Sequence, residues 1–268
     1  MSAHATLLLA LALYTIVAVH AFVRAVSRTR ALSRWAHVAL LVGFVCHTLA
    51  LGQRWALAGH FPAVGLHDVS AFLSWTVVFV FLLVHAATHV EALALAALPV
   101  AFVLALIASL TQPSGRSDPI LKSFFLPVHT TFAFLGYGAL FVAFAMGLLY
   151  LIGERELRSR APRLFYYLVP SLERCDTIGG RSTVFGLTFL TLAIVTGMLW
   201  SHAARGFFFA GSAKEWSAFA AWLIYVALLV ARYRSGWGGR RAAWLGIAGF
   251  PIVLFVFVWI TLFARGAR

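Results

Sequence analysis

The sequence predicts an all-α fold: a polytopic membrane bundle of about eight transmembrane helices. The first observation is composition, because 62% of the 268 residues are hydrophobic and only 11% are charged, whereas soluble domains carry about a quarter charged residues. The second is the mean hydropathy of +0.93. The third is arithmetic: eight spans of about 20 residues use about 160 positions, which is roughly the apolar total. We therefore expect a single integral-membrane domain over residues 1–268, with no separate soluble domain.

Eight apolar stretches of membrane-spanning length follow one another along the chain. The first is followed rather than preceded by arginines, the reverse of a signal peptide's charge order, so we expect it to be retained as a helix. Most prolines lie in or beside the connecting segments, which leaves Pro99 and Pro251 as the expected kinks. The stretches cover residues 5–23, 36–53, 69–88, 92–110, 128–152, 183–202, 216–231 and 243–263.

The formal net charge of +13 is interpreted as a topology signal. The segments that follow odd-numbered stretches hold fourteen of the basic residues, and the opposite side holds seven. Basic residues favour the cytoplasmic side, so this excess predicts that both termini lie outside a bacterial-type inner (plasma) membrane. The bilayer is the expected partner. No nucleic-acid partner is predicted, because clusters of aromatic and basic residues that stack on bases are absent.

Several classes of chemistry are disfavoured by what the sequence lacks. No CxxC or CxxCH motif occurs, so the chain is neither a thiol oxidoreductase of that kind nor a c-type cytochrome. The predicted spans contain no acidic residue, which argues against a proton-coupled pump or a transporter. The longest cytoplasmic segment, residues 153–182, is expected to form a short interfacial helix with Phe165, Tyr166 and Tyr167 toward lipid.

Histidines at the predicted outer side are the most informative polar residues. Neutral imidazoles among aromatic side chains can ligate haem iron in a flat apolar cleft, and nearby cations can meet the propionates. No HxxxH or HExxH spacing indicates any other metal. Ordinary structural roles stay open for all of them: a loop, a hydrogen bond between helices, or an interfacial aromatic belt. The candidate haem-binding residues are His129, His202, His60, His67, His47, Phe209, Trp216, Arg54 and Arg205.

Four segments, taken in order, resemble the membrane proteins of cytochrome c assembly, of the CcsA type and its shorter HemX and YpjD relatives. They begin GFVCHTLALGQRW at 43, LPVHTTFAFLGYG at 126, LERCDTIGGRSTV at 172 and KEWSAFAAWLIYV at 214, and the best match runs over 43–250. In that family a tryptophan-rich WWD segment at the outer face presents haem between two axial histidines. His129 matches the first of these, at the start of HTTFAFLGY. The family's WGSYWSWDPKE run aligns with RGFFFAGSAKE, which retains only Gly206, Lys214 and Glu215.

The resemblance implies a haem-handling protein of cytochrome c assembly that binds or presents haem at the outer face. No histidine follows His202, so His202, His60 or His67 could supply a second ligand, and ligation by one histidine alone would leave an open iron. Other cytochrome c assembly proteins and apocytochrome c are the implied partners, and no catalysis by the chain alone is expected. The alternative is a HemX-like regulatory or scaffolding protein, whose segment 153–182 contacts a cytoplasmic haem-biosynthesis enzyme, glutamyl-tRNA reductase.

Overall fold

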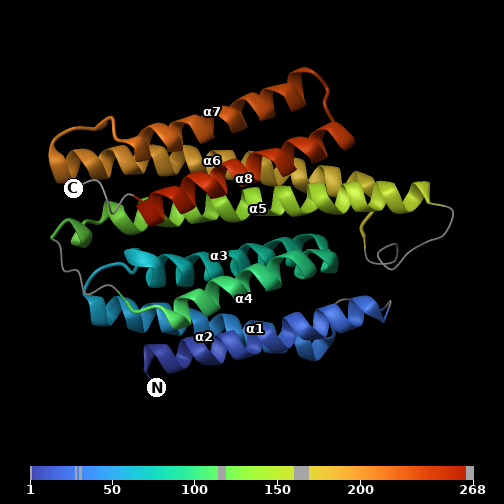
Figure 1. The fold of residues 1–268 in the computed structure, drawn as a ribbon, viewed down its shortest axis with the longest axis horizontal. Helices are drawn as coiled ribbons and strands as arrows, with labels where there is room; N and C mark the ends of the chain where they lie inside the picture. The colour runs from blue at the N-terminus through green and yellow to red at the C-terminus, as the bar shows by residue number, and fades with distance from the viewer. Residues whose placement is uncertain (1, 28, 30–31, 114–118, 160–168, 264–268) are drawn as a thin grey trace. The chain divides into compact units, whose positions relative to one another are not determined.

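The computed structural model describes residues 2–27, 29, 32–113, 119–159 and 169–263. Within these ranges the ordered elements are all helices, which confirms the predicted all-α fold (Figure 1). The α-helices are α1 (Ala3–Val26), α2 (Arg34–Ala58), α3 (Gly65–Thr88), α4 (Ala94–Leu110), α5 (Phe125–Arg158), α6 (Leu172–Arg205), α7 (Ala213–Arg234) and α8 (Arg240–Phe263). Two short 3-10 helices, η1 (Glu91–Leu93) and η2 (Pro119–Lys122), precede α4 and α5.

Seven helical segments among the described residues are long and apolar enough to cross a membrane. They correspond to the first seven predicted stretches, so the chain is a multi-pass membrane protein. The eighth stretch is helical as α8 but is not one of these seven. Pro99 and Pro251 both lie inside helices, in α4 and α8. The location in an inner membrane and the outside position of the termini stay predictions.

The helices pack into two compact units. One comprises Met1–Ser117 with Ile152–Ser171, and the other comprises Asp118–Leu151 with Leu172–Arg268. Within each unit the helices run lengthwise beside one another (Figure 1). The single domain expected from the sequence stays a prediction.

In the first unit, α1 packs against α2 and α4, and α3 packs against α4. Small side chains let these helices approach closely, as is usual between helices in membranes. The buried cluster at their contact consists of Leu7, Ala50, Ala71 and Ala108, one from each helix. An ion pair between Arg54 of α2 and Asp68 of α3, at 3.1 Å, joins two of the helices near their ends.

In the second unit, α6 and α7 pack against each other and both contact α8. A buried cluster of Leu140, Leu190, Ala221 and Tyr225 ties α5, α6 and α7 together. Glycine makes the α5–α6 approach possible, because a Cβ at Gly186 would lie only 2.5 Å from the side chain of Leu140. This close approach brings the first turns of α5 against the last turns of α6, where the candidate site lies.

The predicted interfacial helix is not a separate element where the structure describes it. Residues 153–158 continue α5 without a break, and α6 already begins at Leu172. Strong helix formers and an i,i+4 ion pair between Glu154 and Arg158, at 2.8 Å, favour this extension. Phe165, Tyr166 and Tyr167 lie outside the described residues. The HemX-like regulatory role connected with this segment therefore stays a prediction.

Candidate functional site

A cavity of about 380 Å³ lies in the second unit, at the end where α5 begins, α6 ends and α7 begins. Its size falls within the range of small-molecule sites. Aromatic rings from the α6–α7 connection and from α7 form much of its wall, namely Phe208, Phe209, Trp216 and Phe219. Small and large side chains of α6, among them Met198 and Trp200, line the rest. The result is an apolar space with flat walls.

His129, in the second turn of α5, provides the imidazole of this cavity. Its Nδ1 lies 2.7 Å from the carbonyl oxygen of Ala193 in α6. A carbonyl only accepts hydrogen bonds, so Nδ1 carries the proton and Nε2 carries the lone pair of the neutral ring. The Trp200 ring stacks beside it, with the ring centroids 6.2 Å apart. The imidazole is thus fixed in both tautomer and orientation, as metal-ligating histidines usually are.

Gly197 makes the room for this hydrogen bond. It lies one helical turn after Ala193, so its side-chain position would normally cover the Ala193 carbonyl. An ideal Cβ at Gly197 would lie 2.9 Å from Nδ1 and 3.0 Å from Cε1 of His129. Any larger residue at this position would therefore push the imidazole away. Neither Ala193 nor Gly197 was predicted from the sequence, although AIVTGMLWSHAAR places positions 193, 197, 201 and 205 on one helix face.

The connection between α6 and α7 holds the aromatic wall by its backbone. Gly206 adopts a φ of 84°, which favours glycine, and its N–H donates to the carbonyl of His202 to end α6. Ser212 and Glu215 form a capping box at the start of α7. Glu215 Oε2 also accepts the N–H of Ala210, at 2.9 Å. Gly206 and Glu215, two of the three residues predicted to match the WWD segment, therefore shape this loop.

Four of the nine predicted residues line this one cavity: His129, Arg205, Phe209 and Trp216. Phe209 and Trp216 meet edge to face, with centroids 5.1 Å apart. His202 is not among the lining residues. Its ring lies flat on Phe208, with centroids 4.2 Å apart and an interplanar angle of 13°, so it supports the aromatic wall.

Three other predicted residues, His47, His67 and Arg54, line a separate cavity of about 430 Å³ in the first unit. His67 Nδ1 donates to the carbonyl of Ala108, at 2.6 Å. His47 is fully buried, with its Nδ1 3.3 Å from the hydroxyl of Tyr14. Arg54 is occupied by its ion pair with Asp68. These contacts are ordinary structural ones, namely hydrogen bonds and an ion pair between helices.

The remaining candidate, His60, is buried just after the end of α2, and its Nδ1 donates to the carbonyl of Phe61. It does not line either of the two cavities described above. No group of three His, Cys, Asp or Glu side chains among the described residues is placed to hold a bare metal ion.

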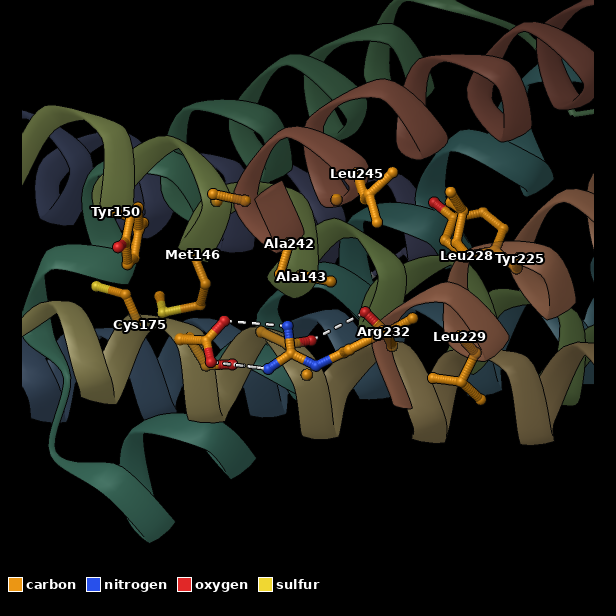
Figure 2. A pocket seen from close by; sticks show the side chains of 17 residues that line it. Ala143, Met146, Tyr150, Cys175, Tyr225, Leu228, Leu229, Arg232, Ala242 and Leu245 are labelled. Atoms are coloured by element: carbon orange, nitrogen blue, oxygen red, sulfur yellow. Dashed lines mark hydrogen bonds and ion pairs between the residues drawn. The ribbon is translucent and has the colours of Figure 1, made fainter. Parts of the chain in front are cut away.

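A third, much smaller cavity of about 30 Å³ lies at the other end of the second unit, where α6 begins. Figure 2 shows Arg232 reaching into it between Met146 and Leu229. The guanidinium binds both carboxylate oxygens of Asp176, at 3.0 and 2.9 Å, and the N–H of Gly239 donates to the same carboxylate. The space holds about one water molecule. We call this arrangement of Asp176, Arg232 and Gly239 the clasp, because it joins α6, α7 and the start of α8.

Taken together, the fold and the site define a class of protein: a multi-pass helical membrane protein with an aromatic cavity at one end of its second unit and a fixed imidazole in that cavity. The family follows from comparison with known proteins. Residues 63–266 match the model of the cytochrome c assembly protein family, and the chain belongs to that family.

Curated relatives extend the similarity toward the N-terminus. The chain is 29% identical over 243 residues to a cytochrome c biogenesis protein CcsA of Prochlorococcus marinus strain MIT 9301, covering 82% of this chain and 79% of the relative. It is 26% identical over 239 residues to the CcsA protein of Guillardia theta, with the same coverage. The CcsA protein of Trieres chinensis is 27% identical over 270 residues, which is 89% of this chain and 86% of the relative. A role in cytochrome c biogenesis follows.

Proposed function

We propose that this protein binds haem in the cavity between α5, α6 and α7 and presents it at the outer membrane face during cytochrome c assembly. The observation that carries the proposal is the His129 imidazole. It stands in an aromatic cavity with Nδ1 bonded to a backbone carbonyl, which makes Nε2 the basic nitrogen. Haem is the cargo in this proposal, because nothing in the site indicates bond chemistry by the chain itself.

The residues of the cavity fit the chemistry of a porphyrin. Flat aromatic faces pack well against a planar macrocycle, and an imidazole is a common axial ligand of haem iron. The hydrogen bond to Ala193 fixes the tautomer and the direction of the ring. Arg205 at the edge of the cavity supplies a cation that can pair with a carboxylate.

In this proposal, partner proteins attach haem covalently to the cytochrome. The chain has two cysteines, Cys46 in α2 and Cys175 near the start of α6. Cys175 is buried beside the clasp, at the opposite end of the second unit from His129. The thiols for a thioether bond would therefore come from an apocytochrome c, delivered with other assembly proteins. The excess of basic residues after odd-numbered spans supports an inner-membrane location with the His129 end outside.

Haem titration of the purified protein tests the proposal. We expect the detergent-solubilised wild type to develop a Soret band that saturates with added haem, and we expect His129→Ala to weaken this binding at least about tenfold. The matched control is His37→Ala, because His37 is a half-buried histidine of α2 that lines neither large cavity. Saturable binding that is identical in the wild type and His129→Ala would contradict the assignment of the ligand. Complete lack of a Soret band in the folded wild type would contradict haem binding altogether.

A further inference from the structure

Two hydrogen-bond donors in the lining of the His129 cavity lack an acceptor. Trp200 Nε1 and Ser201 Oγ are buried, and neither has a hydrogen-bond partner among the described residues. Ser201 as a whole is only 8% exposed. Buried polar atoms are almost always hydrogen-bonded in native proteins, so an unpaired pair in one cavity calls for an explanation. The shared location indicates an acceptor supplied by a ligand.

Arg205 adds a third donor on the same helix face. It follows Ser201 by one helical turn, so the two side chains project from α6 in the same direction. No ion pair joins Arg205 to a carboxylate among the described residues. An indole N–H, a hydroxyl and a guanidinium together present several donors and one positive charge. The group that complements them is a carboxylate, which only accepts hydrogen bonds and carries the opposite charge.

Glu215 is the one acidic residue in the lining, and it has a different role. Its Oε2 accepts the N–H groups of Ala210 and Ser212, at 2.9 and 3.0 Å. These bonds commit the carboxylate to the loop between α6 and α7, so it does not neutralise Arg205. At the same end of the unit α6 terminates and α7 begins, so the partial charges of the two helix ends oppose each other.

We propose that Trp200, Ser201 and Arg205 form a carboxylate subsite that receives the propionates of the haem. This inference rests on the proposed function and predicts how the bound haem is oriented in the cavity. The His129 imidazole meets α6 at Gly197. Ser201 lies about 6 Å and Arg205 about 12 Å further along the same helix face, at 1.5 Å per residue. In this arrangement His129 would hold the iron, while Ser201 and Arg205 would hold the propionates nearer the end of α6.

The test compares haem with haem dimethyl ester, in which both propionates are uncharged and accept only weaker hydrogen bonds, through their ester carbonyls. Purified wild-type protein is titrated with each and followed by the Soret band. We expect haem to bind at least about tenfold more tightly than the ester, since hydrogen bonds to a charged group are typically worth about that factor. Ser201→Ala and Arg205→Gln should each weaken the binding of haem more than the binding of the ester.

Ser182→Ala is the matched control. Ser182 lies in the same helix and is equally buried, at 7% exposure, but it does not line the cavity. It should bind both ligands as the wild type does. Equal affinity of the wild type for haem and its ester, or variants that weaken both alike, would overturn the subsite while haem binding stands. Absence of binding by either ligand would instead overturn the proposed function.

Discussion

The missing side chain at Gly197 leads to a specific prediction about the His129 site. Gly197→Ala places a methyl group 2.9 Å from Nδ1 and 3.0 Å from Cε1 of the imidazole, whereas ordinary contacts begin at 3.4 Å. The ring must therefore retreat by about half an ångström. This movement carries Nδ1 away from the carbonyl of Ala193, which it now meets at 2.7 Å. The substitution disturbs the orientation of the ligand without removing it.

The expected loss of haem affinity can be judged from other metal-bound histidines whose second ring nitrogen loses its hydrogen bond. Loss of such a hydrogen bond typically weakens metal binding by about 10- to 100-fold, which corresponds to about 1.4 to 2.8 kcal/mol of binding free energy. Helix stability changes in the opposite direction, because alanine is favoured over glycine in a helix interior by about 1 kcal/mol. A weaker haem complex would therefore not be explained by a less stable α6.

The assay is a haem titration of the purified Gly197→Ala protein, with the Soret maximum and the dissociation constant as readouts. Gly52→Ala is the matched control, since Gly52 also lies within a helix and a Cβ there meets nothing within 4 Å. We expect a shifted Soret maximum and weaker binding for Gly197→Ala only. Wild-type affinity and spectrum in a folded Gly197→Ala protein would refute the idea that His129 binds haem iron in the position that Gly197 allows.

Three further predictions address the clasp, the aromatic wall and the topology. Asp176→Asn should lower the free energy of unfolding by about 1–3 kcal/mol, seen as a lower melting temperature in detergent. Arg158→Gln, at an arginine that is 70% exposed in an i,i+4 pair, should change it by less than about 0.5 kcal/mol. Equal shifts would contradict the assignment of the clasp. His202→Phe should keep the stacking on Phe208 and bind haem with a wild-type spectrum, while a changed spectrum would identify His202 as the second ligand. Alkaline phosphatase inserted at Gly236 should be inactive, and an insertion between α2 and α3 should be active; the reverse pattern would invert the predicted topology.

The sequence predicted the spans well because the physical signal is strong and local. A stretch of about 20 apolar residues is stable across a bilayer only as a helix, so the existence of each helix follows from composition. The ends were less predictable. Residues 153–158 and 172–182 are polar yet helical, because helix propensity extends α5 and α6 beyond the apolar stretch, helped in α5 by the ion pair of Glu154 with Arg158.

The composition of the candidate site was only partly predictable. His129, Arg205, Phe209 and Trp216 were selected by residue type, and they do line one cavity. Spacing alone could not separate them from His47, His67 and Arg54, whose side chains are of the same types but line a cavity of the first unit. The partner of His129 is a backbone carbonyl 64 residues away. Such a contact depends on which backbone carbonyl a glycine leaves accessible to another helix. A pattern of residue types does not predict which carbonyl this is.

The segment predicted to match the family's WWD run has well-defined ends in this structure. Gly206 ends α6, Ser212, which the predicted alignment puts at the family's aspartate, is a good N-cap, and Glu215 completes the capping box. In that predicted alignment the family's indole rings are replaced, one of them by the phenyl ring of Phe209. A phenyl ring still gives a flat apolar face but has no N–H to donate. If the cargo carries carboxylates, their donors must then come from another element, and the unpaired donors of α6 are placed to supply them.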